Sequence, residues 1–169
     1  MSNLGIAVLN AETDSQIAPL GEYFQKLGKQ VFAVFDSQTV SNTTKIASSG
    51  IISFESPEKG FENLILKQTS EAALRRFANA IVEAGEWSDH LTDCEPKTTD
   101  RIDDIKKSLG KYFKHNKGSG ATAEFIDQCQ TCDEIPIFIR NTLRAIKEEV
   151  YPIAEDKEID CLVEPEGEK

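Results

Sequence analysis

Two short apolar runs with an amphipathic stretch between them constrain the fold of this chain more than any other feature. Residues 5–9 (GIAVL) and 31–35 (VFAVF) are apolar throughout, which is typical of strands buried on both faces of a sheet. Between them, residues 17–27 carry apolar side chains at helical spacing and are followed by Gly28, a residue type that often ends helices. A helix between two such strands predicts a parallel pair with a right-handed crossover. We therefore expect residues 5–9 and 31–35 to be adjacent strands in the middle of an α/β sheet.

The remainder of the chain favours one more strand and then helices. Residues 50–54 (GIISF) predict a third strand, whereas the small and polar residues 37–49 predict a loop with at most a weak helical turn. Residues 86–100 lack periodicity and predict a second loop. Apolar side chains at helical spacing predict helices around residues 61–67, 70–81, 102–113, 123–126 and 135–150.

These patterns divide the chain into three parts. Residues 1–56 are expected to form an α/β core, and residues 57–152 a helical C-terminal section of the same domain. Residues 153–169 form an acidic tail that we expect to be disordered, because its last 15 residues hold seven acids and two bases. The expected fold class is therefore α/β, a parallel sheet with a helical C-terminal section.

Composition excludes two classes of protein. All apolar runs are far shorter than the ~20 residues that a membrane span needs, and the first residues do not resemble a signal peptide, so we expect a cytoplasmic protein. The 19 Lys and Arg residues against 29 Asp and Glu give a net charge of -10. This charge has the wrong sign for a domain that holds DNA by neutralising phosphates alone. Binding to nucleic acid would need metal ions between carboxylates and phosphates, or a basic partner.

Three acidic residues stand where an α/β fold places its ligands. Asp36 directly follows the strand at residues 31–35, and ligands of open parallel sheets bind outside the carboxyl ends of the strands. A hard cation such as Mg²⁺ prefers these oxygen ligands. Glu55 ends the third strand, and Glu62 lies in the first turn of the next helix. The alternative is that Asp36 opens a turn and that Glu62 only offsets the helix dipole.

Residues 117–120 (KGSG) could present a cation and backbone N–H groups to a phosphate at the start of a helix. The order of residues differs from that of a Walker A loop. A glycine-rich connection between helices is the simpler interpretation.

The four cysteines include one pair, Cys129 and Cys132, at the spacing of a zinc knuckle. No second pair at this spacing completes a zinc site, so free thiols are the favoured interpretation for the cysteines of this chain. His90 and His115 lie in or next to polar stretches and are expected at the surface.

Several of these segments, taken in order, are similar to those of one known family. They are GIAVLNA (5–11), KLGK (26–29), VFAVFD (31–36), KGFENLIL (59–66), LRRF (74–77) and KGSGATAE (117–124). At these spacings, residues 4–151 resemble the Toprim-containing C-terminal part of the OLD (overcoming lysogenization defect) family of ATP-dependent endonucleases.

This resemblance implies a Toprim-like, Rossmann-type fold and metal-dependent cleavage of phosphodiester bonds in DNA, in phage defence. By position, Asp36 resembles the first acid of the Toprim D-x-D motif and Glu62 a second metal ligand, for Mg²⁺ or Mn²⁺. Lys117 resembles the catalytic lysine that stabilises charge at the scissile phosphate. ATP would be bound by an ABC-type ATPase domain or chain, DNA would be bound by the complete enzyme, and a homo-oligomer is possible.

Two departures from the family pattern favour a chain that is inactive on its own. Gln38 stands where the family has its second acid, and the family's glutamate-bearing strand and ATPase would precede Gly5. We therefore expect a piece of a longer or split enzyme that is inactive alone, or a degenerate, non-catalytic Toprim module for dimerisation or partner binding in a bacterial defence complex. A receiver-like signalling domain that is phosphorylated on Asp36 is a third possibility, which the helical C-terminal half disfavours.

Overall fold

The structure is a computed structural model that describes residues 5–117 and 120–152. It has a mixed α/β fold with a small parallel sheet and many helices. The chain divides into two compact units, Met1–Leu64 and Ile65–Lys169, called here the N-terminal and the C-terminal unit. The predicted acidic tail at residues 153–169 lies outside the described residues.

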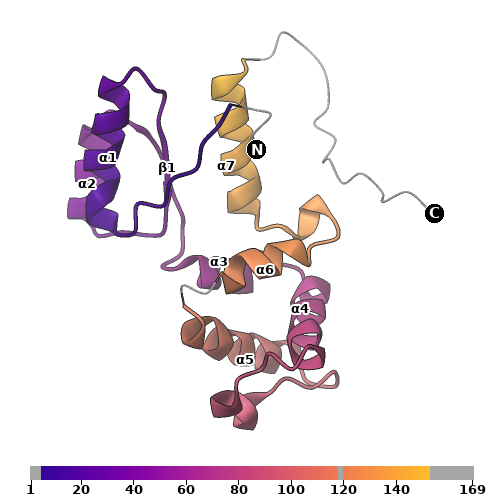
Figure 1. Ribbon diagram of the computed structural model, residues 1–169. Helices are drawn as coiled ribbons and strands as arrows, with labels where there is room; N and C mark the ends of the chain where they lie inside the picture. The colour runs from indigo at the N-terminus through magenta and orange to yellow at the C-terminus, as the bar shows by residue number, and fades with distance from the viewer. Residues whose placement is uncertain (1–4, 118–119, 153–169) are drawn as a thin grey trace. The chain divides into compact units, whose positions relative to one another are not determined.

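The N-terminal unit is a two-stranded parallel sheet with two helices beside it (Figure 1). The strands pair in parallel, with Phe32 opposite Ile52 and Phe35 opposite Glu55. Strands at 31–35 and 50–54 were expected, so both of these predictions are confirmed. The elements are α1 (Asp14–Lys26), β1 (Phe32–Phe35), α2 (Val40–Ser48), β2 (Ile52–Glu55) and the first residues of α3 (Phe61–Gln68).

The two faces of this sheet differ in burial. Ala33 and Phe35 of β1 form a small core with Ile46 of α2 and with Ile51. The opposite face carries only apolar side chains, which are exposed or half-buried: Val34 is 43% exposed and Ile52 36%, next to Phe32 and Phe54. One face of the sheet therefore supplies most of the buried apolar surface of this unit.

The expected strand at residues 5–9 is wrong. Residues 6–10 form no regular structure, and Val8 and Leu9 are 78% and 60% exposed. An apolar run indicates a strand only where a partner edge exists, and β1 pairs with β2 instead. The parallel pair that defines the α/β class is therefore β1–β2, with α2 in the crossover between them.

The expected loop at residues 37–49 is also wrong, because α2 lies within it. The Thr39 side chain accepts a hydrogen bond from the Asn42 N–H at 3.4 Å and so caps the helix. Ile46 of this helix is buried in the core. Thr, Ser and Asn are weak helix formers, so the composition of this segment hid a helix that tertiary packing stabilises.

The C-terminal unit is helical, as expected from the periodicity of its sequence. Ser70 caps its first complete helix by accepting the Ala73 N–H at 3.2 Å. Within the described ranges, no helix combines the length and the apolar character that crossing a membrane requires. The elements are α4 (Glu71–Glu83), η2 (Asp89–Cys94), α5 (Ile102–His115), α6 (Ala121–Asp127), η3 (Cys132–Glu134) and α7 (Ile137–Val150).

Aromatic side chains form the centre of the C-terminal core, where α4 and α5 pack side by side (Figure 1). Phe77 stacks on Phe113 at 5.7 Å between ring centroids and meets Tyr112 and Phe125 edge-on at 6.2 and 5.3 Å. Trp87 stacks on Tyr112 at 5.3 Å. These contacts join α4, α5, α6 and the segment before η2 into one core.

Candidate functional site

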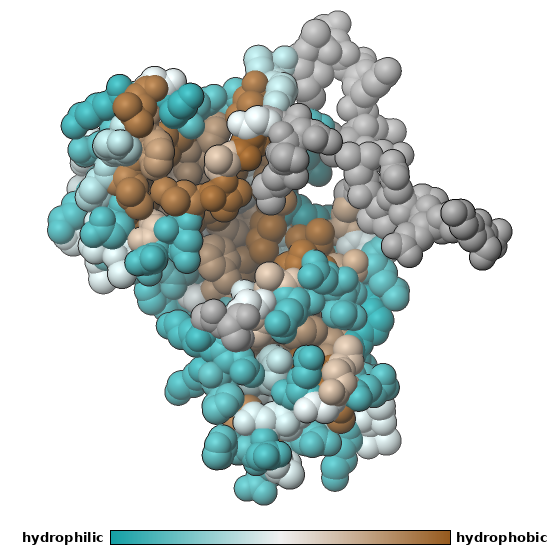
Figure 2. Space-filling model, in the orientation of Figure 1, coloured by the Kyte–Doolittle hydropathy of each residue, from teal (hydrophilic) through white to brown (hydrophobic). Residues whose placement is uncertain are grey.

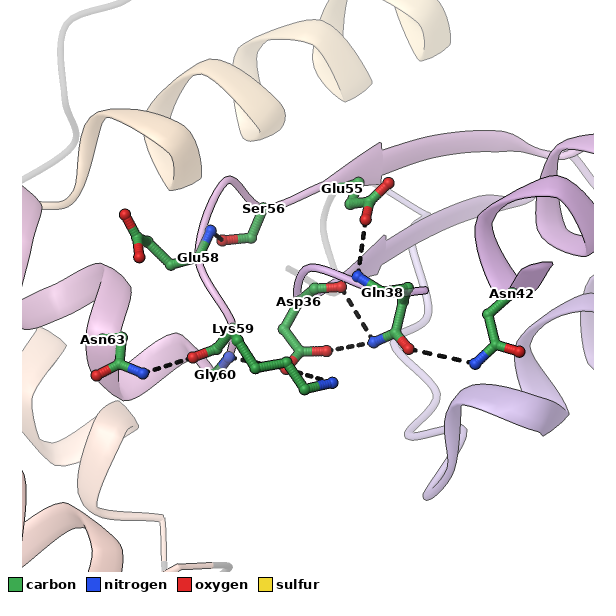
Figure 3. A network of polar contacts seen from close by, with 9 residues as sticks. All are labelled: Asp36, Gln38, Asn42, Glu55, Ser56, Glu58, Lys59, Gly60 and Asn63. Atoms are coloured by element: carbon green, nitrogen blue, oxygen red, sulfur yellow. Dashed lines mark hydrogen bonds and ion pairs between the residues drawn. The ribbon is translucent and has the colours of Figure 1, made fainter. Parts of the chain in front are cut away.

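The carboxyl ends of β1 and β2 carry a network of polar side chains (Figure 3). Asp36 directly follows β1 and Glu55 is the last residue of β2. Because Phe35 is opposite Glu55 in the parallel register, both acids lie at the same edge of the sheet. Sequence reasoning expected this edge to be the ligand-binding one.

Three donors hold the Asp36 carboxylate, whose side chain is 19% exposed. Its Oδ2 accepts the Gly60 N–H at 2.7 Å and lies 3.4 Å from the Lys59 ammonium nitrogen. Its Oδ1 accepts a hydrogen bond from the Gln38 side-chain amide. The protein's own groups therefore use most of the acceptor sites of this carboxylate, and a metal ion that binds there competes with Lys59 and Gln38.

The Glu62 carboxylate lies close to the same glycine. A Cβ atom added to Gly60 would lie 2.6 Å from Oε1 and 2.8 Å from Oε2 of Glu62. Gly60 also has a φ of +80°, which favours glycine. The structure therefore brings the two predicted metal ligands, Asp36 and Glu62, against one residue, Gly60, although they are 26 positions apart in the sequence.

Glu55 has a structural role in this network. Its Oε1 accepts the Gln38 N–H at 2.8 Å, and its Oε2 accepts the Thr43 hydroxyl at 3.2 Å. The Gln38 side-chain oxygen accepts a weaker hydrogen bond from Asn42 at 3.5 Å. Glu55 thus fixes the connection between β1 and α2, which orients Gln38 toward Asp36.

Sequence reasoning assigned no role to Lys59 and Gly60. In the structure, both residues lie in the loop after β2 and contact Asp36. Lys59 does so through its ammonium group and Gly60 through its N–H. The available signal was a Lys-Gly pair directly before a predicted helix, at the carboxyl edge of a strand.

Lys117, the predicted catalytic lysine, belongs to the C-terminal unit. It lies exposed in the turn after α5. Residues 118 and 119 of the same motif lie outside the described residues. The role of Lys117 beside Asp36 and Glu62 stays a prediction.

Three of the four cysteines lie among the described residues. Cys94 and Cys129 are free thiols, as expected, whereas Cys132 is disulfide-bonded, which corrects the expectation for that residue. Burial raises the pKa of the Cys129 thiol, and the charge of Glu134 raises it further, against the opposing effect of Arg76.

The donor set decides which metal centre is feasible at the sheet edge. Among the described residues, no group of three or more His, Cys, Asp and Glu side chains could hold a metal ion. Mg²⁺ commonly binds one or two carboxylates and completes its shell with water and substrate phosphate. By number alone, the two carboxylates of Asp36 and Glu62 would be enough for a single hydrated Mg²⁺ ion but too few for a two-metal centre.

Comparisons of the chain with models of protein families, with curated proteins and with solved structures gave no match.

Proposed function

We propose that this chain is the Toprim nuclease portion of an OLD-type ATP-dependent DNA endonuclease that cleaves phosphodiester bonds with the help of Mg²⁺ or Mn²⁺. One observation supports the proposal above the others. Asp36 follows a parallel strand at the carboxyl edge of the sheet and shares Gly60 with the Glu62 carboxylate. In this proposal Asp36 and Glu62 hold the metal ion, and Lys117 stabilises the charge on the scissile phosphate.

The residues around Asp36 would prepare the site. The Gly60 N–H fixes Oδ2 of Asp36, so the carboxylate needs little reorganisation to bind a cation. The Lys59 side chain is 70% exposed and can leave Asp36 at little cost. A bound metal ion would supply positive charge next to the phosphate.

The same geometry predicts low activity of the chain alone. The side-chain nitrogen of Gln38 faces Asp36, where the family pattern has an acid. A neutral amide is a weaker metal ligand than a carboxylate, and two carboxylates leave a two-metal mechanism incomplete. We propose that an ABC-type ATPase, as a domain or a separate chain, or a second copy of this chain completes the enzyme.

A second candidate function is favoured by the closed network itself. Gln38 and Lys59 satisfy Asp36 without any metal ion, as in a site that has lost catalysis. The chain would then be a degenerate Toprim module for dimerisation or partner binding in a bacterial defence complex. Metal binding at Asp36 separates the two candidates.

The first experiment detects the metal ion at Asp36. Mn²⁺ added to the isotopically labelled chain should broaden the backbone NMR signals of residues near Asp36 and Gly60, because Mn²⁺ is paramagnetic. The Asp36→Asn variant should lose this broadening, whereas Glu22→Gln, which removes an exposed acid on α1, should keep it. Equal broadening in all three proteins, or none in any, would reject the metal site and favour the non-catalytic module.

The second experiment measures plasmid nicking by the purified chain with Mg²⁺ or Mn²⁺, beside Asp36→Ala. We expect slow nicking that requires Asp36. Fast nicking that Asp36→Ala abolishes would show that the site is complete, so the explanation from missing acids would be wrong. Nicking that persists in Asp36→Ala would reject the assignment of Asp36.

A further inference from the structure

A cleft in the C-terminal unit carries a charge opposite to that of the whole chain. It is a shallow depression, largely open to solvent, with a volume of about 370 Å³ between α5 and η2. Its lining residues are Leu91, Lys111, Lys114 and His115. Although η2 contains two acids, Asp89 and Asp93, neither of them lines the cleft.

The cleft lies in the most basic part of the sequence. Residues 105–123 contain no acid, in a chain with a net charge of -10. The five lysines of this segment are Lys106, Lys107, Lys111, Lys114 and Lys117. The segment therefore forms a local excess of positive charge, and the net charge of the chain hides it.

The two lysines of the cleft differ from Lys107 in their ion pairs. Lys107 forms an ion pair with Asp104 at 3.2 Å. Within the described ranges, neither Lys111 nor Lys114 forms an ion pair, and both are exposed. Their charges are available to an external anion.

Helical geometry aligns the side chains of the cleft. Lys111, Lys114 and His115 stand at positions i, i+3 and i+4 and share one face of α5. A cation in the last turn stabilises a helix through its dipole, which accounts for Lys114. Lys111 lies further from the helix end, and its like-charged neighbours at i-4 (Lys107) and i+3 cost stability. A bound anion would relieve this repulsion.

The wall of the cleft is fixed in advance. Trp87 stacks on Tyr112 of α5 and donates a hydrogen bond from its indole nitrogen to the Leu91 carbonyl at 2.9 Å. The Ser88 hydroxyl lies 3.4 Å from Nε2 of His115. These contacts hold η2 against α5, so the backbone that carries the cleft is in place before a ligand binds.

We propose that this cleft binds phosphate groups of a nucleic-acid backbone. Ammonium groups without acidic partners on a fixed surface are typical of phosphate contacts. Lys107 stands one turn before Lys111 on the same face of α5, so the positive charge extends along the helix beyond the reach of one free phosphate. The inference depends on neither Asp36 nor a metal ion, and it stands apart from the proposed nuclease activity.

The test is the binding of a short, fluorescently labelled DNA duplex to the full chain, measured by anisotropy in EDTA at several salt concentrations. The double variant Lys111→Gln, Lys114→Gln should bind at least about tenfold more weakly, and its salt dependence should fall by about two units of slope, one for each lost phosphate contact. The matched control is Lys26→Gln, Lys45→Gln. It removes the same charge from α1 and α2 of the N-terminal unit and should bind like the original chain.

Three outcomes would overturn the proposal. Equal weakening by both double variants would show that net charge acts without a defined site. Absence of DNA binding by the original chain at low salt would reject the nucleic-acid ligand. Inorganic phosphate that shifts the NMR signals of Lys111 and Lys114, with no competition from DNA, would identify a site for free phosphate. Since EDTA removes metal ions, failure of the proposed nuclease function changes none of these results.

Discussion

The two units of this chain use their charged side chains in opposite ways. At the sheet edge of the N-terminal unit, Lys59, Gln38 and the Gly60 N–H already hold the Asp36 carboxylate. In the cleft of the C-terminal unit, Lys111 and Lys114 form no ion pair with any residue that the structure describes. At the first site an incoming cation competes with donors that are already in place, whereas the positive charges of the second site attract an incoming anion. The net charge of a chain therefore says little about the charge of an individual site.

The units also differ in their cores. Among the described residues, four buried side chains form the cluster of the N-terminal unit, and 13 form that of the C-terminal unit. Figure 2 shows apolar side chains at the surface of the N-terminal unit, whereas the surface around α5 and η2 is mostly polar. Because apolar burial is the main favourable term in folding, we expect the C-terminal unit to be the more stable of the two.

Removing an aromatic ring from the C-terminal core should have the largest effect on the stability of that unit. Phe77→Ala deletes the ring that contacts Tyr112, Phe113 and Phe125, and we expect it to lower the free energy of unfolding of the C-terminal unit by about 3–5 kcal/mol. Trp87 is the only tryptophan of the chain and lies in that core. Its fluorescence during urea unfolding therefore reports on this unit alone.

The matched variant is Phe35→Ala, in the core of the N-terminal unit. If the two units unfold separately, Phe35→Ala should leave the urea transition of Trp87 unchanged. The N-terminal unit should then lose its far-UV circular dichroism at a lower urea concentration than in the original chain. A shift of the Trp87 transition as large as that of Phe77→Ala would show that the two units unfold as one.

A second, smaller effect concerns the ion pair of Arg76 and Glu134 in the C-terminal unit, whose side chains are 30% and 13% exposed. The hydrogen bond from Arg76, followed by that from the Gln130 N–H, lowers the pKa of Glu134. A lowered pKa in the folded state stabilises the protein above the unfolded-state pKa of about 4.3, and this stability is lost as the pH falls.

Glu134→Gln should therefore cost about 1–2 kcal/mol at pH 7, and the difference from the original chain should shrink below about pH 4. Urea unfolding monitored by Trp87 at both pH values measures it. The control is Glu83→Gln, which removes an exposed acid of α4. A cost that stays constant with pH would contradict the assigned ion pair.

The sequence predicted the parts of this fold that depend on local pattern. The apolar runs before Asp36 and Glu55 are strands, and the capping residue Ser70 begins a helix with a buried apolar face. Residues 5–9 have an equally apolar pattern but are not a strand, because pairing depends on distant partners that periodicity does not reveal.

The candidate site, too, was predictable only where it depends on local sequence pattern. Its position was predictable from Asp36 at the end of an apolar run. Two of the groups that hold Asp36 were not predictable, because Lys59 and Gly60 belong to a loop more than twenty residues later in the sequence. Such contacts form only when the chain has folded, and no local spacing encodes them.

A third effect separates backbone strain from the contact with Glu62. Gly60 and Gly50 have φ values of +80° and +73°, so alanine at either position should cost about 1–2 kcal/mol. At Gly60 the new Cβ would meet the Glu62 carboxylate. At Gly50 no atom lies within 4 Å of the new Cβ. Gly60→Ala should therefore also reduce Mn²⁺ broadening near Asp36, and Gly50→Ala should not. Equal broadening in both variants would show that Glu62 takes no part in metal binding.

The smallest expected effect comes from Gln38→Glu at the sheet edge. The change replaces the amide that bonds to Asp36 with a carboxylate. Two adjacent carboxylates repel each other, and a divalent cation relieves the repulsion, so Mg²⁺ should bind more tightly by about threefold to tenfold, which is no more than about 1.4 kcal/mol. Calorimetric titration with Mg²⁺ measures the change.

Gln38→Ala distinguishes a new ligand from the loss of a competing donor. It removes the amide without adding an acid, so its affinity for Mg²⁺ should stay below that of Gln38→Glu. If both variants gain equally, the amide only blocks Asp36, and the missing acid is not what limits the site. Neither variant should change DNA binding in EDTA, because the cleft beside α5 shares no residue with the sheet edge. A change there would mean that DNA contacts both units, and the contrast between a closed acidic site and an open basic one would have to be abandoned.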